Sequence, residues 1–326
     1  MKRHPRIILG ICILLLGIAS LGLGPAKISF ADTFSTLFGK NLDASQIYII
    51  RDLRLPRILS AIFCGAILGS CGAVFQAALR NPMADPFVLG VSSGASFGVA
   101  LSISLGYSSI IGLPFSALVG ALLTTLFIFS LGMHTKVSKT TLLLTGVATN
   151  YILSAGMTLL MFLHHEQYDR ILFWTMGSFS SSTWSQVIYT FIVSLLCIIP
   201  LSLKHRDLDM LLLDEGSALS GGFPMGRARI LFLLLATLGV ATCVSFFGVI
   251  GFIGLMAPHV IRLILGPSHK HLLLPTAMFG SLLLLGSDTL SRIILPSGEM
   301  PVGVITSLLG APLFVWMLKK GRSDYV

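Results

Sequence analysis

Charged side chains are scarce in this sequence. Only 11% of its 326 residues are Asp, Glu, Lys or Arg, whereas 54% are hydrophobic. A water-soluble domain usually has about a quarter of its residues charged, and a soluble chain of this length needs far more polar surface than these residues supply. The composition therefore excludes an ordinary soluble domain and indicates a chain that is largely surrounded by lipid.

The sequence also lacks the motifs of common catalytic and metal centres. It contains no G-x-x-x-x-G-K-[ST] nucleotide-binding loop and no HExxH zinc motif. Its five cysteines lie inside apolar runs and form no CxxC pair, which argues against a disulfide framework and against zinc. His164 and His165 are interpreted as solvated loop residues rather than metal ligands. We therefore expect no catalytic residue, no metal site and no cofactor in this chain.

Long apolar runs are what the sequence has in abundance. An uncharged run of about 20 residues is typical of a membrane-spanning helix. Lipid offers the backbone no hydrogen bonds, so a spanning chain must be helical or a closed barrel, and these runs are too continuous for alternating barrel strands. The sequence predicts an all-α polytopic membrane protein, with residues 1–326 as a single transmembrane domain of about ten helices. The predicted spans are residues 7–23, 58–79, 87–105, 110–133, 140–163, 184–203, 228–247, 250–265, 272–294 and 302–318.

The basic residues predict how the chain is oriented. The first run follows three basic residues, but it is longer than the apolar part of a signal peptide, so we interpret it as a retained span. With the N-terminus inside, about two thirds of the 22 Lys and Arg residues face the cytoplasm. An even number of spans places both termini there, which is the reason for keeping the short eighth span that Pro258 interrupts. This predicts a multi-pass protein of the cytoplasmic membrane with both termini in the cytoplasm.

Glycine spacing and one unusual loop predict how the helices pack and where they stop. The pairs Gly65-x-x-x-Gly69 and Gly94-x-x-x-Gly98 form faces of small residues that allow close helix contact. In residues 80–86, two prolines end one helix and begin the next, and Asn81 and Asp85 can cap free backbone groups. This loop is either a rigid cytoplasmic turn or part of an inner gate.

The cytoplasmic loop between spans six and seven, about residues 207–227, mixes apolar and acidic residues. Asp207 is expected to cap a short helix that extends through Glu215, and a second short stretch ends at Gly221 and Gly222. These elements are too short to span a membrane. Their composition suits an amphipathic helix that docks on a partner or lies at the membrane interface.

Several polar residues are not explained by topology. Arg54, Arg57 and Arg292 lie at the predicted outer side, against the general bias; they either anchor the helices at lipid headgroups or dock an acidic outer partner. Asp288 lies four residues before Arg292 on one helix face, so the two are expected to pair. Span five carries a polar stripe that faces the bundle or a water path. The stripe consists of Thr145, Thr149, Asn150 and Ser154.

Taken in order, a set of motifs is similar to the FecCD-type permeases of ABC transporters. Four residues of the second predicted span belong to the pattern: Gly65, Gly69, Gly72 and Gln76. The remaining motifs are RLPR at 54–57, RNPMADP at 80–86, LGVSSGA at 89–95, GFIGLMAPHVIR at 251–262, DTLSR at 288–292, EMPVG at 299–303 and GAPLF at 310–314. The resemblance runs from about residue 54 to residue 319. One departure is Met83, where the family usually has Leu, a change that conserves volume.

The resemblance implies a type II ABC importer permease with ten helices that works as a dimer. Its partners would be a second permease copy (we favour two identical copies), two cytoplasmic ATPase subunits that hold ATP and Mg, and an outer binding protein that is periplasmic or lipid-anchored. The cargo would be an iron chelate such as a siderophore, haem or cobalamin. No nucleic acid is implied, and the sequence does not identify the substrate.

The resemblance also implies roles for individual residues. Arg54, Arg57 and Arg292 would meet carboxylates of the binding protein. Spans five and ten would line the path, with Thr145, Thr149 and Asn150 on span five. Asn81 and Met83 would lie near the inner gate. The residues that couple to the ATPase would be Asp214, Glu215, Gly216, Ala218, Leu219, Gly221 and Gly222.

Two alternatives belong to other functional classes. An ion-coupled secondary transporter is expected to show inverted repeats and an ionisable residue at the membrane midplane; no clear repeat is present, and Asp288 sits off-centre beside a local partner. An intramembrane enzyme would need a nucleophile with a base, and the Ser-rich residues 178–185 lack an obvious base. Both alternatives explain less of the sequence than the permease hypothesis does.

Overall fold

The computed structural model describes residues 4–24, 33, 44–107, 109, 112–133, 139–213, 223–295 and 298–321. The regular elements within these ranges are all helices. Seven of the described helices are long and apolar enough to cross a membrane by length and composition, and the apolar parts of three more are shorter. The prediction of an all-α polytopic protein is therefore confirmed.

Each predicted span corresponds to one helix of the structure. These helices are α1 (His4–Gly22), α4 (Leu55–Leu79), α5 (Val91–Ser104), α6 (Gly112–Met133), α7 (Lys139–Leu163), α9 (Trp184–Leu203), α12 (Met225–Phe247), α13 (Ile253–Leu265), α14 (His269–Ile293) and α15 (Val302–Gly321). Short elements connect them: α3 (Ala44–Tyr48), the π-helical turn η1 (Ile49–Arg54), the 3₁₀ turns η2 (Pro86–Leu89) and η3 (His165–Gln167), α8 (Tyr168–Thr175) and α10 (His205–Met210).

Some helix boundaries differ from the prediction for local reasons. The second span begins earlier, because α3 and η1 continue into α4 as one helical stretch from Ala44 to Leu79. Gly90, in the left-handed region at φ 77°, separates η2 from α5 and divides the third predicted span. Asp207 does not cap α10: the helix begins at His205, and the Asp207 carboxylate instead pairs with Lys204 Nζ at 3.5 Å.

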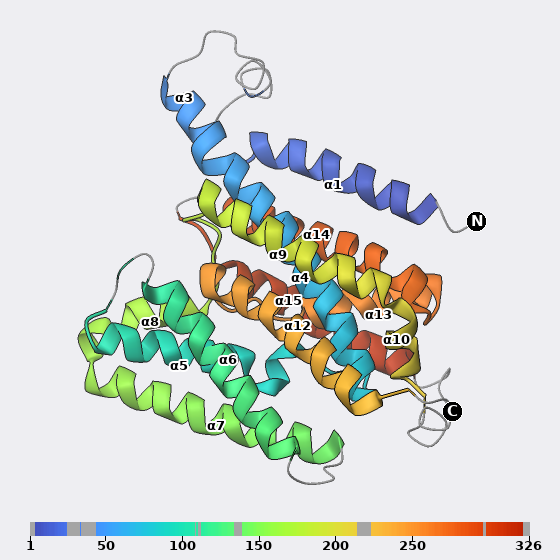
Figure 1. The fold of residues 1–326 in the computed structure, drawn as a ribbon. Helices are drawn as coiled ribbons and strands as arrows, with labels where there is room; N and C mark the ends of the chain where they lie inside the picture. The colour runs from blue at the N-terminus through green and yellow to red at the C-terminus, as the bar shows by residue number, and fades with distance from the viewer. Residues whose placement is uncertain are drawn as a thin grey trace.

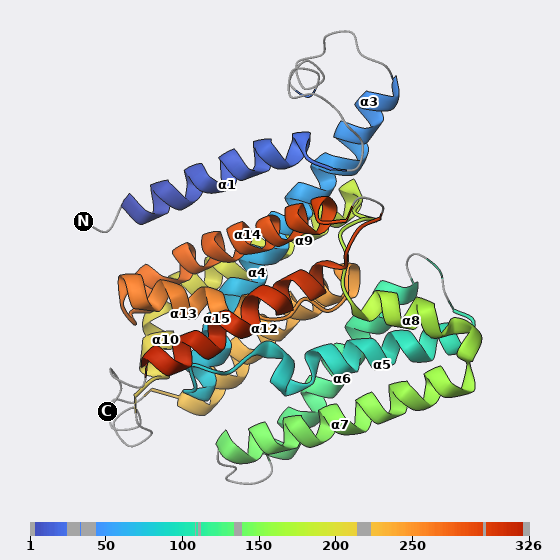
Figure 2. The ribbon, with the colours of Figure 1, turned by 180° about the vertical axis from the view of Figure 1, so that it is seen from behind.

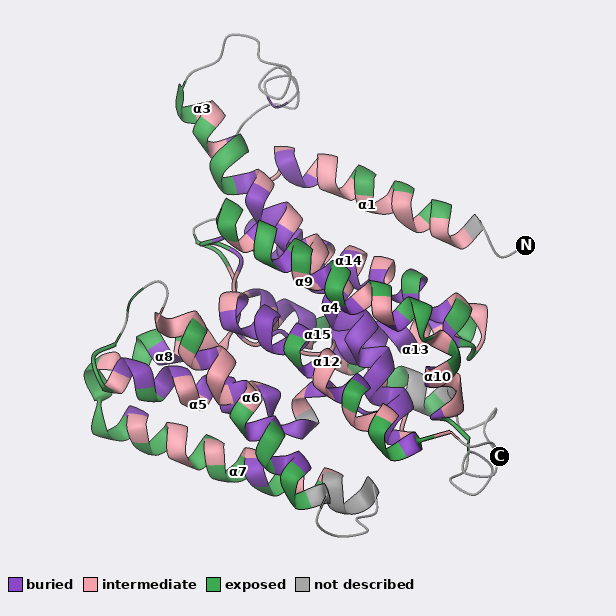
Figure 3. Ribbon diagram, viewed as in Figure 1, coloured by how far each residue is buried: buried purple, intermediate pink, exposed green. Residues whose placement is uncertain are grey.

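Helix α4 is the central element of the bundle. It packs against α14, α9, α12 and α13, and most of its residues are buried, whereas α1 is mostly of intermediate exposure and α7 is largely exposed (Figure 3). The helices α5 to α8 form a second group beside this layer (Figure 1). The start of α1, the start of α14, the end of α15 and α10 all lie at one end of the bundle (Figures 1 and 2). By the predicted orientation this is the cytoplasmic end.

The glycine faces bring helix backbones into direct contact, as predicted. A Cβ atom added at Gly65 would lie 2.4 Å from the carbonyl oxygen of Gly280 on α14. One added at Gly72 would lie 1.9 Å from the carbonyl oxygen of Gly254 on α13, and one at Gly94 would lie 2.5 Å from that of Gly120 on α6. Because lipid gives helices little hydrophobic reason to associate, such close packing is a main source of bundle stability.

Three irregular segments from distant parts of the chain meet where α8 and α12 end and α15 begins. The Ser178 N–H donates to the carbonyl oxygen of Phe247 at 2.8 Å, and the Val302 N–H donates to that of Gly177 at 3.0 Å. The Gly303 N–H donates to the Met176 carbonyl oxygen at 3.1 Å. These contacts satisfy backbone groups that no helix ladder can reach, so the junction joins three helix ends through backbone alone.

The contact of Gly72 with Gly254 predicts a sharp sensitivity to one methyl group. Gly72→Ala forces α4 and α13 apart, and we expect a loss of about 1–3 kcal/mol or more in unfolding free energy. The matched control is Gly226→Ala in the first turn of α12, where an added Cβ meets nothing within 4 Å; it is expected to be neutral or slightly stabilising. Thermal unfolding of both variants in detergent checks this, and equal melting temperatures would contradict it.

Candidate functional site

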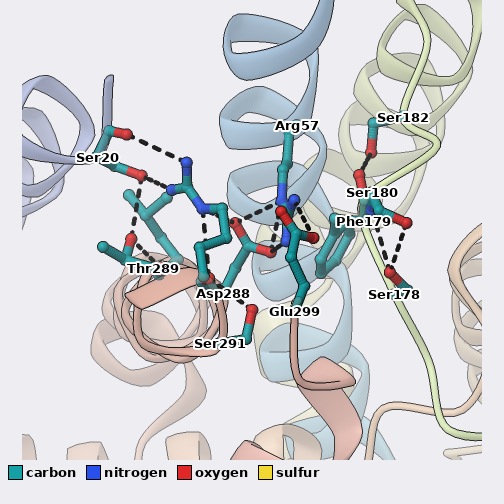
Figure 4. Close-up of polar contacts among 12 residues, drawn as sticks. Ser20, Arg57, Ser178, Phe179, Ser180, Ser182, Asp288, Thr289, Ser291 and Glu299 are labelled. Carbon is teal, nitrogen blue, oxygen red and sulfur yellow. Dashed lines mark hydrogen bonds and ion pairs between the residues drawn. The ribbon is translucent and has the colours of Figure 1, made fainter. Parts of the chain in front are cut away.

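A buried ion cluster joins α4 and α14 at the end of the bundle that is predicted to face outward. Arg57 of α4 contacts the carboxylate of Asp288 on α14 through two nitrogen atoms. Its Nε lies 2.9 Å from Oδ1 and 3.1 Å from Oδ2, and its Nη2 lies 2.9 Å from Oδ1. The Arg57 Nη1 donates to Glu299 Oε2 at 2.7 Å. The Asp288 side chain is 0% exposed and that of Glu299 is 29% exposed. Figure 4 shows Arg57 between the two carboxylates.

Arg292 extends this cluster to the end of α1. Its Nε lies 3.4 Å from Asp288 Oδ2, so the predicted pairing four residues apart is confirmed. Its Nη1 donates to the carbonyl oxygens of Ser20 at 3.2 Å and Leu23 at 3.1 Å, and its Nη2 donates to the Ser20 hydroxyl. A helix end leaves such carbonyl groups without intrahelical partners and favours a cation. Arg292 therefore fixes the C-terminus of α1 against α14.

Arg54 makes the same kind of contact from η1. Its Nη1 donates to the carbonyl oxygen of Leu21, and its side chain is buried. The three predicted docking arginines are thus brought together. With Glu299 and Ser180 they line a cavity of about 360 Å³ at this predicted outer end. Three guanidinium groups face two carboxylates there, so the cluster carries an excess of positive charge.

Sequence reasoning missed two parts of this cluster. Glu299 lies in a recognised motif, but nothing in its local pattern indicates that it pairs with Arg57, 242 positions away. The contacts of Arg54 and Arg292 with the end of α1 were missed as well, because backbone carbonyl groups leave no trace in a sequence.

The loop 80–86 at the opposite end is a capped turn. The Met83 N–H donates to Asn81 Oδ1 at 2.9 Å, and the Phe87 N–H donates to Asp85 Oδ1 at 2.8 Å. The predicted capping by Asn81 and Asp85 is confirmed. Met83 remains 47% exposed, so the side chain at the tip of this turn is available to a neighbour.

The polar stripe of α7 divides into two kinds of residue. The Thr149 hydroxyl donates to the Thr145 carbonyl oxygen at 2.8 Å, within its own helix. Asn150 reaches out of the helix: its Oδ1 accepts from the Ser93 hydroxyl at 2.6 Å, and its Nδ2 donates to the Phe87 carbonyl oxygen at 3.3 Å. Asn150 therefore links α7 to the chain that follows the 80–86 turn.

The predicted ATPase-coupling residues lie outside the described part of the chain. This applies to Asp214, Glu215, Gly216, Ala218, Leu219, Gly221 and Gly222. The structure describes the two flanks of that segment, α10 with Leu211–Leu213 on one side and Phe223 with α12 on the other. Within the described residues, no group of three or more His, Cys, Asp or Glu side chains could hold a metal ion.

The capping carboxylate of Asp85 predicts a dependence of stability on pH. Burial raises the pKa of Asp85 to about 6, although the hydrogen bond from the Phe87 N–H opposes this rise. Between pH 4 and 6 the folded state then binds more protons than the unfolded state, so stability falls as pH rises through this window. Asp85→Asn keeps a capping oxygen without the charge. We expect its melting temperature relative to wild type to rise from pH 4 to 6 and then level off; a constant difference would contradict this.

Comparison with known proteins agrees with this arrangement. The model of the FecCD transport family matches residues 12–320. The chain is 36% identical over 331 residues to the hemin transport system permease protein HmuU of Yersinia pestis, covering 98% of each chain. It is 36% identical over 319 residues to the vitamin B12 import system permease protein BtuC of Vibrio cholerae, covering 97% of this chain and 92% of that protein.

A solved structure shows the same fold. It is described as an inward-facing conformation of a metal-chelate type ABC transporter, and it matches with a TM-score of 0.87 and 33% identity over 97% of this chain and 98% of that chain. The family model and the relatives cover nearly the whole sequence, including the outer arginine cluster and the 80–86 turn. The chain belongs to the FecCD transport family.

Proposed function

We propose that this ABC importer permease of the inner membrane carries a metal chelate, such as an iron siderophore or haem, or cobalamin, which an outer binding protein delivers. The observation that carries the proposal is the outer cavity, where Arg54, Arg57 and Arg292 converge around an excess of positive charge. The hemin and vitamin B12 permeases similar to this chain support that substrate class.

The outer cavity suits a partner that presents carboxylates. Arg57 is already occupied by Asp288 and Glu299, and of these two only Glu299 is partly exposed. A carboxylate of the binding protein would exchange with Glu299 and leave the buried Arg57–Asp288 pair intact. In this exchange one carboxylate replaces another, so the buried Arg57 guanidinium keeps a partner for its charge throughout. Glu299 is therefore the side chain that a docking partner displaces.

On the cytoplasmic side, the segment from Asp214 to Gly222 docks on a separate ATPase subunit. ATP and Mg belong to that subunit, and this chain supplies a bundle with two arrangements rather than bond chemistry. ATP closes the ATPase pair, the bundle opens outward and receives substrate, and hydrolysis returns it inward. What supports this part is the family relationship together with the position of the two described flanks, α10 and the start of α12, at the predicted cytoplasmic end of the bundle.

The translocation path lies between two copies of this chain. Large apolar side chains on α7 and α15 are exposed in the single chain, among them Tyr151, Phe162 and Trp316. An exposed apolar face on a permease subunit faces lipid or a second copy. We assign α7 and α15 to the path, with Thr145, Thr149 and Asn150 along α7. Asn81 and Met83 stand near its inner gate.

Purification of the tagged chain from its native membrane tests the proposal. We expect an ATPase subunit to co-purify and its ATP hydrolysis to rise when the binding protein is added. Uptake into vesicles should stop when ATP is depleted. Uptake that persists on an ion gradient alone, with no associated ATPase, would replace this proposal with an ion-coupled secondary transporter.

The docking role of the arginine cluster predicts a gain of affinity in one variant. Charge reversal at Arg57 is a poor test, because it would leave Asp288 buried against another carboxylate. Glu299→Gln removes the displaced carboxylate and keeps the buried pair. We expect it to bind the binding protein about two- to fivefold more tightly, measured by immobilising the permease complex.

The matched control is Glu166→Gln, which removes one exposed negative charge from the predicted outer side without touching the cluster. An equal gain in both variants would show a general effect of net charge. No gain in Glu299→Gln would show that Glu299 does not compete with the partner.

A further inference from the structure

Arg80 connects the two flanks of the cytoplasmic segment 214–222. Its Nε donates to the carbonyl oxygen of Leu211 at 2.7 Å, just after α10, and its Nη2 lies 3.0 Å from the sulfur of Met225, the first residue of α12. The planar guanidinium presents donors in several fixed directions, which a lysine cannot do. One side chain at the end of α4 therefore contacts the chain both before and after the segment.

The backbone conformation of Arg80 terminates α4. Arg80 follows the last residue of α4 with φ 48° and ψ 40°, in the left-handed region. Its N–H donates to the carbonyl oxygen of Ala77 at 3.1 Å, and the N–H of Asn81 donates to that of Gln76 at 3.0 Å, which is a common way for a helix to end. The chain turns away from α4 at this residue, and the Arg80 side chain contacts both flanks of the loop from there.

A second connection runs from α10 to α14. Asp209 Oδ1 accepts from the His269 backbone N–H at 2.9 Å and lies 2.6 Å from His269 Nδ1; its Oδ2 lies 3.4 Å from the Ser268 hydroxyl. The N-cap residue of α14, Ser268, makes no side-chain cap of its own. Asp209 therefore supplies the carboxylate that a helix N-terminus favours, and it does so from another element.

The electrostatics of this cap keep Asp209 ionised. Desolvation raises the pKa of Asp209, but the hydrogen bonds from the His269 ring and backbone outweigh it, and the pKa is lowered overall. His269 itself is 1% exposed. The Asp209 carboxylate at the N-terminus of α14 is therefore charged at neutral pH, and it holds α10 to α14 by a charge-assisted hydrogen bond.

Helices α4 and α14 pack backbone to backbone between these contacts and the predicted outer cluster. Their backbones touch at Gly65 with Gly280 and at Gly69 with Thr276, which leaves no side-chain layer to yield between them. Their outer ends are joined by Arg57 and Asp288. The inner ends of the same pair carry Arg80 and His269, so the pair extends from the outer cavity to both flanks of the cytoplasmic segment.

We propose that Arg80 and the Asp209–His269 contact are positioning residues that fix the base of the cytoplasmic loop to the α4–α14 pair, so that a displacement of the loop moves the pair. The proposal rests on the proposed function, in which the ATPase displaces this loop. Without these contacts the loop would still reach the ATPase, but its movement would be absorbed at the flanks. Coupling, rather than assembly, is the property that these residues control.

The test uses the complete complex of permease, ATPase and binding protein in proteoliposomes. The first variant, Arg80→Lys, keeps the positive charge but loses the planar guanidinium that contacts both flanks. The second variant, Asp209→Ala, removes the carboxylate that caps the N-terminus of α14. We expect co-purified ATPase and basal hydrolysis to stay near wild type, while stimulation by binding protein and substrate uptake per ATP fall about fivefold or more. Asp209→Asn, which keeps a capping oxygen, should restore part of the loss.

Two exposed residues on the same elements serve as controls, Arg206→Gln on α10 and Lys270→Gln beside His269. Both should couple like wild type. If Arg80→Lys and Asp209→Ala assemble and couple as these controls do, the inference is overturned. If Asp209→Ala fails to accumulate, Arg80→Lys decides: unchanged uptake per ATP overturns the inference, and a loss supports it. A wild-type complex without an ATPase or without stimulation would instead refute the proposed function.

Discussion

The close approach of α4 to its neighbours is the constraint on which the rest of the structure depends. In lipid, helices gain little from burying apolar surface against each other, so their association relies on packing and on polar contacts. Gly65, Gly69 and Gly72 allow the α4 backbone to touch α14 and α13 directly. This contact fixes the spacing at which Arg57 can reach Asp288 at one end and Arg80 can reach the α10 flank at the other. Both polar sites follow from the packing of one helix.

The buried charges are stable only as a set. Asp288 is fully buried, and it is held by two arginines from different helices. Removing one partner of a buried pair commonly costs about 3–5 kcal/mol, because the other charge remains without compensation. Glu299 differs from the rest of the set because it is partly exposed. The cluster therefore consists of buried residues that hold the helices together, Arg57, Asp288 and Arg292, and of one partly exposed residue, Glu299, that another carboxylate can replace.

The sequence was informative where the cause of a structure is local. Apolar runs predicted each span, small-residue spacing predicted the glycine faces, and capping residues predicted the turn at Asn81 and Asp85. The i to i+4 spacing predicted Asp288 with Arg292. The prediction for Asp207 was wrong because Lys204, three residues earlier, takes its carboxylate and the helix begins before it.

What the sequence could not supply are contacts set by the fold. Arg80 with Leu211, Asp209 with His269, and Arg57 with Glu299 are each separated by 60 or more positions. Several of these partners are backbone groups, which any residue type provides. Such contacts depend on which helices become neighbours, and helical periodicity carries no information about that.

The backbone junction among residues 176–178, 247–249 and 302–303 bears on how the chain enters the membrane during synthesis. Each helix can satisfy its own amide groups as soon as it leaves the translocation machinery. The backbone groups of the junction cannot be satisfied at that stage. The carbonyl oxygen of Gly177 accepts its hydrogen bond from the Val302 N–H, which is present only after α15 has been synthesised. We therefore expect the first nine helices to form an insertion intermediate with an unfinished outer surface. Truncation of the chain before Val302 then affects a region more than a hundred residues upstream, and quality-control proteases would encounter the defect there.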